Sequence, residues 1–292
     1  MDVAAVEQVR RFNRTVTQRI GALDDAYLAR GRSLGQSRLL WEIGTGASEL
    51  RALRSRLDLD SGYLSRLLRA LRAEGLVVVE TDEADARVRT ARLTPAGLAE
   101  LAQLDRLSDE LATSILSPLN EKQRDRLVAA MGEVERLLVA SMVDVDVVDP
   151  RQPDARFCLD AYFADLAARF PGGFDPARSI SAEDKELTLP SGLLLVARLH
   201  GEPVGCGALK FRGELAEVKR MWVSPDVRGL GLGRRLLAEL ETHAVSYKVR
   251  TLRLETNGTL TEAIGLYLAA GYREVEAFND EHYAQHWFEK AL

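Results

Sequence analysis

The chain has 292 residues, which is long for one domain and typical of two. Its composition, 46% hydrophobic and 28% charged, is that of an ordinary globular protein, and a net charge of −5 does not by itself suggest a nucleic-acid partner. We expect no membrane partner, because no apolar run reaches the length of a membrane span and the N-terminus has no apolar signal core. Cys158 and Cys206 lie far apart and follow no metal or redox spacing, which favours a reducing cytoplasm.

The charge is distributed unevenly. Residues 1–140 carry 21 Lys and Arg against 21 Asp and Glu, so the net charge of −5 belongs to residues 141–292. Within the neutral part, residues 51–72 carry six arginines against two aspartates. A local basic stripe is a better indicator of DNA binding than the overall charge.

Residues 1–140 are predicted to be nearly all helical. Apolar periodicity predicts a helix over 33–43 and another over 49–57, for which Ser48 is a candidate cap. A third helix is predicted from Asp60 or Ser61 to Glu74, ending at Gly75. Two β-runs, 76–80 and 87–93, then flank a polar turn. Helix, turn, helix and hairpin in this order predict a winged helix, whose second helix suits the major groove of DNA.

This segment resembles the MarR-type transcriptional regulators. The matching residues are those at 34–36, 65–71, 74–77, the wing Asp85-Ala86-Arg87, and 93–97. The resemblance implies that Asp85 holds Arg87 and that Arg87 meets DNA at the minor groove, where the potential is most negative. The resemblance also implies DNA contacts from the helix predicted between Asp60 or Ser61 and Glu74. The residues concerned are Ser61, Tyr63, Ser65, Arg66 and Arg69. The alternative is a helical domain with solvated arginines.

Two further apolar stripes follow, at 98–115 and 127–138. In MarR-type proteins the terminal helices build a two-fold dimer that places two recognition helices on adjacent half-sites, so the resemblance implies a homodimer. A monomer that packs these stripes on its own core is the alternative.

From residue 141 the pattern changes to alternating strands and helices. We predict strands over 142–148, 193–199, 203–210, 215–223, 251–255, 272–277 and 283–289, and helices over 154–169, 261–270 and after Gly233. They indicate a mixed sheet with helices on both faces. The predicted domains are therefore 1–140, a winged-helix DNA-binding and dimerisation domain, and 141–292, an α/β (α+β) domain.

A glycine-rich loop, Arg228-Gly229-Leu230-Gly231-Leu232-Gly233, stands between a strand and an amphipathic helix. Such a loop turns backbone N–H groups inward, and the helix N-terminus adds unpaired donors, which together form a pyrophosphate cradle. The spacing matches neither the dinucleotide fingerprint nor the P-loop. With the preceding strand it resembles the acetyl-CoA motif of the GNAT N-acetyltransferase superfamily, and the resemblance covers residues 141–292.

The GNAT resemblance implies a set of residues that bind acetyl-CoA. Many members carry an asparagine seven residues before the tyrosine that corresponds to Tyr267. This chain has Leu260 at that position, and Asn257 is the nearby substitute. The implied acetyl-CoA contacts are Met221, Trp222, Val223, Arg228, Gly229, Leu230, Gly231, Leu232, Gly233, Arg234 and Asn257.

Acetyl transfer to an amine needs a base for the cationic amine and an acid for the departing thiolate. Glu217 and Glu255 each stand where some GNAT members hold a base; we favour Glu217, which precedes the carbonyl-binding strand. The motif from Ala263 through Tyr272 assigns the acid to Tyr267. His282 and His286 have i, i+4 spacing, but their segment looks extended with no third ligand, so we expect no metal.

The sequence is therefore interpreted as a fusion of a MarR-like transcriptional regulator with an acetyl-CoA-dependent N-acetyltransferase. Its expected partners are operator DNA, an amine acceptor and a second copy of the chain. One rival is a regulator whose GNAT domain senses acyl-CoA without turnover. Another is an enzyme whose winged helix serves only dimerisation. The acceptor cannot be read from the sequence, although the net −5 weakly favours cationic amines.

Overall fold

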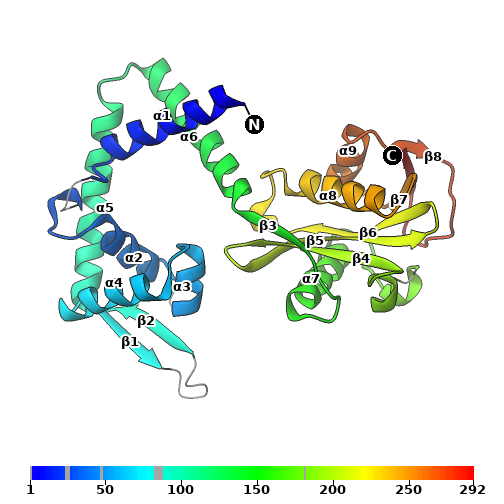
Figure 1. The fold of residues 1–292 in the computed structure, drawn as a ribbon, viewed down its shortest axis with the longest axis horizontal. Helices are drawn as coiled ribbons and strands as arrows, with labels where there is room; N and C mark the ends of the chain where they lie inside the picture. Colours follow the sequence, from blue (N-terminus) through cyan, green and yellow to red (C-terminus); the bar gives the residue numbers. More distant parts are fainter. Residues whose placement is uncertain (1, 24–26, 47–48, 82–87, 181) are drawn as a thin grey trace. The chain divides into compact units, whose positions relative to one another are not determined.

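The computed structural model describes residues 2–23, 27–46, 49–81, 88–180 and 182–292. The chain divides into two compact units, Met1–Gly132 and Glu133–Leu292, each described separately below (Figure 1). Helix α6 (Glu121–Ser141) contains this division and ends next to the boundary that the sequence suggests between residues 140 and 141. That boundary stays a prediction.

The first unit is mostly helical, in agreement with the sequence. Its elements in chain order are α1 (Val3–Arg19), η1 (Tyr27–Ala29), α2 (Leu34–Gly44), α3 (Leu50–Arg56), α4 (Ser61–Ala73), β1 (Val77–Thr81), β2 (Arg89–Leu93), α5 (Pro95–Leu116) and the first part of α6.

Local sequence signals begin and end these helices. Ser33 caps α2 in a capping box with Gln36, and the Asp60 carboxylate accepts the backbone N–H of Tyr63 at 2.8 Å to begin α4. Gly75 follows α4 with φ of +71°, a left-handed conformation that turns the chain into β1. The candidate cap Ser48 lies outside the described residues.

A leucine-rich core holds the helices against the hairpin. Leu39, Leu40, Leu53 and Leu71 are completely buried, and Ala91 from the hairpin joins the same cluster. Strands β1 and β2 pair antiparallel from Val77 with Leu93 to Thr81 with Arg89. The winged helix predicted from the sequence is therefore present, with α4 held rigidly beside its hairpin.

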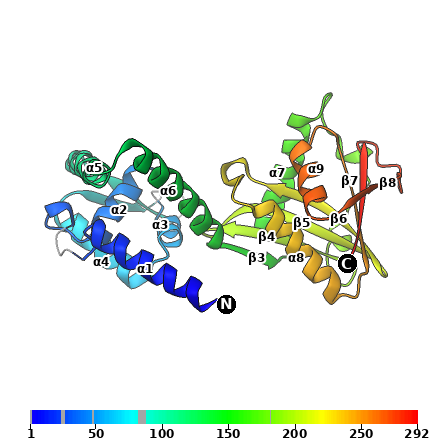
Figure 2. The ribbon, with the colours of Figure 1, turned by 90° about the horizontal axis from the view of Figure 1, so that it is seen from above.

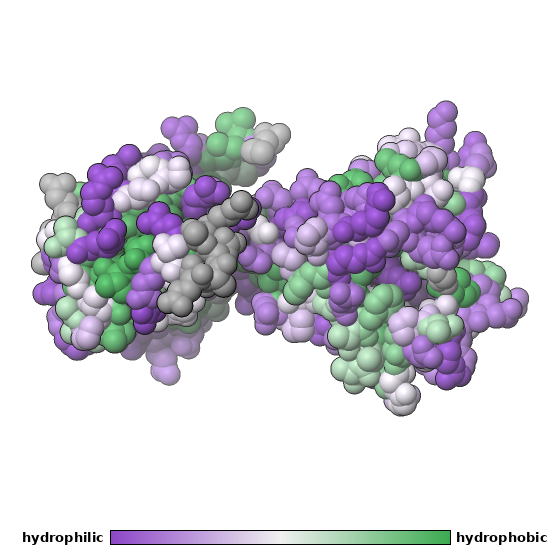
Figure 3. Space-filling view, turned by 90° about the horizontal axis from the view of Figure 1, so that it is seen from below, coloured by the Kyte–Doolittle hydropathy of each residue, from purple (hydrophilic) through white to green (hydrophobic). Residues whose placement is uncertain are grey.

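Helices α1 and α6 contribute no side chain to a buried core. Neither α1 nor α6, all of whose residues are described, has a buried side chain. Hydrophobic side chains reach the surface of both units (Figure 3). On these two helices the exposed large hydrophobic residues are Val3, Val6, Val9, Phe12, Val128, Met131, Leu137 and Leu138.

The second unit is built on a seven-stranded mixed sheet of order β3-β4-β5-β6-β7-β9-β8. Only β6 and β7 pair in parallel; the other neighbours are antiparallel. The elements are β3 (Val143–Val147), α7 (Pro153–Arg169), η2 (Pro176–Arg178), η3 (Asp184–Glu186), β4 (Gly192–Leu199), β5 (Glu202–Arg212), β6 (Leu215–Val223), η4 (Pro225–Val227), α8 (Leu232–Ser246), β7 (Thr251–Thr256), α9 (Thr261–Ala269), β8 (Arg273–Val275) and β9 (His286–Ala291).

Helices cover both faces of this sheet, as the sequence predicts. Helices α8 and α9 lie on one face, seen from that side in Figure 2, and α7 lies on the other (Figure 1). Alternate residues of β4 serve the two cores: Leu193 and Leu195 pack with α8, whereas Leu194 and Val196 pack with α7. The last two strands differ from expectation, because β8 is short and β9 begins only at His286, leaving His282 in a loop.

Candidate active site and nucleic-acid interface

Strands β6 and β7 separate inside the sheet. They pair only from Leu215 with Thr251 to Glu217 with Arg253, although β6 continues to Val223. On its other side β7 pairs with β9 along its whole length. Beyond Glu217 the edge of β6 that faces β7 therefore has no strand partner among the described residues. Alternate backbone N–H and C=O groups on that edge are left available to a ligand.

A β-bulge accompanies this separation. The register between β5 and β6 shifts between Cys206 and Ala208, and Arg220 on the bulged strand has φ of +56°. A left-handed conformation in a residue other than glycine costs about 1–3 kcal/mol and tends to be found at functional sites. The Arg220 guanidinium lies 4.8 Å from the ring centroid of Phe163 and 5.5 Å from that of Tyr162, contacts that fix its direction.

The separation of the strands opens a cleft of about 630 Å³, which we call the main cleft. It lies between the end of β6, the glycine-rich loop, the start of α8, and helices α7 and α9. Its lining is largely apolar, with charged side chains at Asp165, Arg169, Arg228, Arg234 and Glu262. A long ligand with an apolar arm and an anionic end would match this distribution.

The anionic end would meet the start of α8. Gly229 and Gly231 have φ of +85° and +77°, which the loop requires and which only glycine adopts without strain. Helix α8 begins after Gly231 with no side-chain cap, so its first backbone N–H groups keep their hydrogen-bonding capacity beside the cleft. A helix N-terminus of this kind is an anion site, and Arg228 lies next to it, 3.1 Å from Asp165.

A smaller cavity of about 100 Å³, the side pocket, continues from the main cleft. Tyr162, Leu166, Met221, Leu260, Ala263 and Tyr267 line both cavities and mark their junction. A cluster of aromatic rings forms the side pocket's apolar wall. Phe170, Phe174 and Tyr283 contact one another there, with 4.8 Å between the ring centroids of Phe174 and Tyr283.

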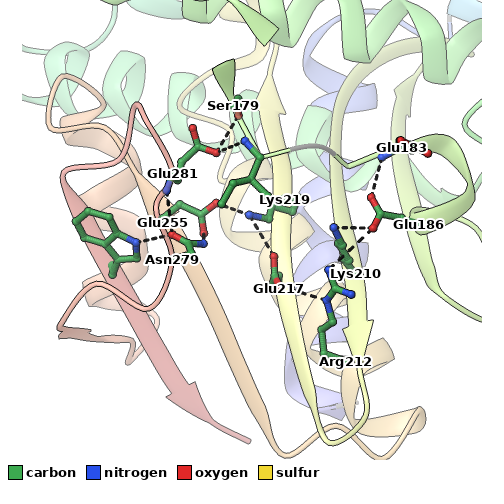
Figure 4. A network of polar contacts seen from close by, with 12 residues as sticks. Ser179, Glu183, Glu186, Lys210, Arg212, Glu217, Lys219, Glu255, Asn279 and Glu281 are labelled. Atoms are coloured by element: carbon green, nitrogen blue, oxygen red, sulfur yellow. Dashed lines mark hydrogen bonds and ion pairs between the residues drawn. The ribbon is translucent and has the colours of Figure 1, made fainter. Parts of the chain in front are cut away.

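Lys219 joins two carboxylates beneath the side pocket (Figure 4). Its ammonium lies 3.3 Å from Glu217 Oε2 and in close contact with Glu255 Oε1. Burial by itself lowers the pKa of Lys219, but the two carboxylates outweigh it and hold that pKa above its ordinary value. The ammonium is therefore charged at neutral pH, and both glutamates have a cation beside them.

Two loops close over this network. The Glu281 carboxylate accepts hydrogen bonds from the Ile180 backbone N–H at 2.6 Å and from the Ser179 hydroxyl at 2.9 Å, so the loop after α7 is tied to the loop before β9 (Figure 4). Asn279 donates its amide to Glu255 at 3.5 Å and accepts the Trp287 indole N–H at 2.8 Å. These contacts hold Glu255 in place at the pocket wall.

Tyr267 lies at the junction of the two cavities. It is buried on α9, between the rings of Tyr272 and Phe288. Burial, followed by the electrostatic effects of Tyr162 and Glu255, raises the pKa of Tyr267 well above its ordinary value. Its hydroxyl is therefore protonated at neutral pH and has a proton to donate.

The two glutamates proposed from the sequence differ in position. Glu255 lines the side pocket, whereas Glu217 lines neither cavity and instead contacts Lys219 and Arg212. Glu217 lies at the end of the paired region of β6 and β7, Glu255 lies two residues beyond it on β7, and Lys219 contacts both carboxylates.

The residues proposed for acetyl-CoA lie in three places. Most line the main cleft: Met221, Trp222, Val223, Arg228, Gly229, Gly231, Leu232, Gly233 and Arg234. Leu230 packs against the core instead. Asn257 lines the side pocket, where its amide donates to the Tyr283 carbonyl at 2.7 Å and accepts from Thr259. Its side chain is thus engaged in fixing a loop, and Leu260 lies at the junction of the cavities.

Sequence reasoning missed several features of this region. Arg220 could be noticed in the sequence as a charged residue within a predicted strand. The bulge that orients it depends on strand pairing and could not be predicted. Cys158 and Cys206, far apart in sequence, are both buried in the core between α7 and the sheet. No group of three or more His, Cys, Asp or Glu side chains among the described residues could hold a metal ion.

In the first unit, α4 and the hairpin border a basic groove of about 820 Å³. Arg51, Arg54, Arg69, Arg72 and Arg89 line it. Within the described part of the chain, none of these arginines has a carboxylate at ion-pair distance. Excess unpaired positive charge beside an exposed helix is the electrostatic signature of a nucleic-acid surface.

The individual DNA contacts proposed from the sequence are placed as follows. Ser61, Ser65, Arg66 and Arg69 are exposed on α4, and the groove includes all of them except Arg66. Tyr63 packs against the core of the unit, and its hydroxyl lies over Gly35 of α2. The Arg66 guanidinium lies 5.4 Å from the centroid of the Tyr63 ring, and a contact of Tyr63 with DNA stays a prediction. Asp85 and Arg87 lie outside the described residues.

Comparison with known families agrees with this description. Residues 159–272 match the acetyltransferase (GNAT) family, and residues 36–97 match a winged helix DNA-binding domain. The chain belongs to the GNAT acetyltransferase family. It is an N-acetyltransferase that uses acyl-CoA, and it carries a winged-helix DNA-binding domain in front of the catalytic one.

Similar proteins match the second unit. The chain is 39% identical over 109 residues to an IAA acetyltransferase of Azospirillum brasilense, a match that spans 36% of this chain and 71% of the relative. It is 37% identical over 92 residues to an uncharacterised N-acetyltransferase of Schizosaccharomyces pombe, spanning 30% and 56% of the two chains. A crystal structure of a putative acyl-CoA N-acyltransferase from Klebsiella pneumoniae is 30% identical, covers 52% of this chain and 98% of that one, and has a TM-score of 0.42.

No helix of the described residues is both long and apolar enough to cross a membrane.

Proposed function

We propose that this protein transfers the acetyl group of acetyl-CoA to an amine and also binds operator DNA as a dimeric, MarR-like regulator. The observation that carries the enzymatic part is the junction of the two cavities. There, a cleft with an uncapped helix N-terminus meets a pocket that holds Glu255, and Tyr267 borders both.

The main cleft suits acetyl-CoA by its distribution of charge. The backbone donors from Gly229 to Gly233 and the side chains of Arg228 and Arg234 would hold the diphosphate. The unpaired edge of β6 at Met221 and Val223 would hydrogen-bond the pantetheine arm and polarise the thioester carbonyl. Arg228 exchanges its contact with Asp165 for the diphosphate when the donor binds.

The chemistry needs one base and one acid. We propose Glu255 rather than Glu217 as the base, because it borders the pocket while Lys219 separates Glu217 from it. The cationic amine loses one proton to Glu255, its nitrogen bonds to the thioester carbon, the carbon–sulfur bond breaks, and the nitrogen releases its second proton to solvent. Tyr267 protonates the departing thiolate and then regains a proton from solvent.

The test is thiol release from acetyl-CoA over a broad panel of amines, with acetyl-CoA binding measured in parallel by calorimetry. Acceptor-dependent thiol release that falls by about 100-fold or more in Glu255→Gln supports the proposal. Absence of acetyl-CoA binding would exclude it. Tight binding without thiol release over the whole panel would favour a sensor of acyl-CoA that has no turnover.

The regulatory part depends on the first unit. The exposed hydrophobic residues of α1 and α6 support a homodimer, because large apolar side chains along whole helices favour burial against a second copy. The arginines of the basic groove, which have no carboxylate at ion-pair distance among the residues that the structure describes, support DNA binding, which we place in the cytoplasm. Salt-dependent binding to an operator, tighter than to random DNA of equal length, is the expected result; equal affinity for both sequences would exclude specific regulation.

A further inference from the structure

Four charged side chains line the side pocket, and two of them, Glu281 and Arg220, have no opposite charge beside them among the described residues. Glu255 contacts Lys219, and the Glu281 carboxylate is satisfied by Ser179 and Ile180. Arg220 is the fourth. No carboxylate among residues 88–180 and 182–292 lies within ion-pair distance of its guanidinium.

The Arg220 guanidinium is held in one orientation. It stacks over the rings of Tyr162 and Phe163, and its backbone sits in the bulge of β6. A guanidinium packed over aromatic rings carries its N–H donors at the edge of the planar group, in a fork that matches the two oxygens of a carboxylate. Lys219 and Met221, the neighbours of Arg220 in the chain, line the same pocket.

The rest of the pocket is apolar. Phe170, Phe174 and Tyr283 form one wall, and Ile180 and Val218 add aliphatic surface. A cationic amine with no other polar group would reach Glu255 but would leave the Arg220 guanidinium without an anionic partner.

The geometry points to an acceptor that carries a carboxylate beside its amine and an apolar or aromatic side chain: a hydrophobic α-amino acid, with Arg220 as the residue that determines specificity. The carboxylate pairs with Arg220, the side chain packs on the aromatic wall, and the amine faces Glu255 and the junction. This inference rests on the proposed N-acetyl transfer. It runs against the overall charge of residues 141–292, which favours cationic amines.

The experiment compares substrates that differ only in the carboxylate: L-phenylalanine with phenethylamine, and L-leucine with 3-methylbutylamine. Each is assayed by acceptor-dependent thiol release for the wild-type chain, Arg220→Gln and Arg220→Lys. Arg273→Gln is the matched control, because Arg273 is exposed on β8 and lines neither cavity. Acetyl-CoA binding and the thermal midpoint are measured for every variant.

We expect the wild type to favour each amino acid over its amine by about 10-fold or more in kcat/KM, since the amine leaves Arg220 unpaired. In Arg220→Gln, kcat/KM for the amino acids falls by about 10- to 100-fold, while that for the amines changes by less than about threefold. Arg220→Lys recovers only part of the loss because an ammonium lacks the planar fork. Arg273→Gln leaves the preference unchanged.

Three results would overturn the inference while leaving the N-acetyltransferase intact. In the first, the wild type acetylates other amines of the broad panel but prefers no carboxylate-bearing member. In the second, Arg220→Gln lowers kcat/KM equally for both members of a pair. In the third, Arg220→Lys restores nothing while Arg220→Gln also lowers the thermal midpoint, which indicates a purely structural role. Absence of acceptor-dependent thiol release with every amine of the panel would instead refute the proposed function.

Discussion

Replacing Lys219 by methionine tests the electrostatic reasoning about the site most directly. The substitution keeps the length and apolar character of the side chain but removes the ammonium that Glu217 and Glu255 share. The side chains of Lys219 and Glu255 are each only 7% exposed, so solvent screens their interaction little. Breaking a buried pair by removing one partner costs about 3–5 kcal/mol, because the other charge is left uncompensated.

We therefore expect Lys219→Met to lower the free energy of unfolding by about 3–5 kcal/mol, or the thermal midpoint by about 6–20 °C for a domain of this size. Denaturant unfolding followed by the fluorescence of Trp222 and Trp287, both in the second unit, measures it. Lys185→Met is the control, because Lys185 forms an exposed pair with Glu183, and it should leave the midpoint unchanged.

The pH dependence follows from the raised pKa of Lys219. A group whose folded-state pKa is raised contributes stability that is fully present below its unfolded pKa, about 10.5, and is lost as pH rises through the folded value. The difference in stability between the wild type and Lys219→Met should thus be constant from pH 7 to about pH 10 and shrink only above that.

A double-mutant cycle separates this explanation from a packing defect. Lys219→Met combined with Glu255→Gln removes both charges of the closest pair, so the double variant should be more stable than Lys219→Met alone. The reasoning would be refuted if Lys219→Met lay within about 1 kcal/mol of the wild type, or if the double variant were no more stable than the single one.

Four further predictions concern the other parts of the molecule. Tyr267→Phe should lower kcat by about 100-fold or more while leaving acetyl-CoA affinity unchanged in calorimetry, because it removes only the proton donor; an unaltered kcat would exclude Tyr267 as the acid. Gly231→Ala places a Cβ on a residue with φ of +77°, so differential scanning calorimetry should show a loss of about 1–2 kcal/mol, whereas Gly132→Ala on α6 should lose nothing. Arg69→Ala should weaken operator binding and reduce the salt dependence of log K by about one contact in fluorescence anisotropy titrations; an unchanged slope would contradict a phosphate contact. Met131→Glu on α6 should shift sedimentation from dimer to monomer, and a dimer that persists would remove α6 from the interface.

Structural features that depend only on residues close together in the chain could be predicted from the sequence. The cap at Asp60, the stop at Gly75 and the period of Leu64, Leu67, Leu68 and Leu71 define α4 within a residue or two. The glycines at 229 and 231 similarly signal left-handed backbone before an amphipathic helix. Hydrogen bonds within a turn and the burial of one helix face depend only on neighbours along the chain, so such elements can be predicted without their tertiary context.

The choice between residues of the same type depends on tertiary structure. The sequence favoured Glu217 over Glu255 as the base, whereas the divergence of β6 from β7 makes Glu255 a wall of the side pocket. Tyr63 has the spacing of a surface residue but packs inward over Gly35. Lys219 and Arg220 acquire their partners from strands and helices far away in the chain. The sequence by itself determined which elements form, and it predicted the loop that would hold acetyl-CoA and the tyrosine that would donate a proton. Strand register and the bulge decided which charges meet, because the pairing of β5, β6 and β7 sets the direction of every side chain between them.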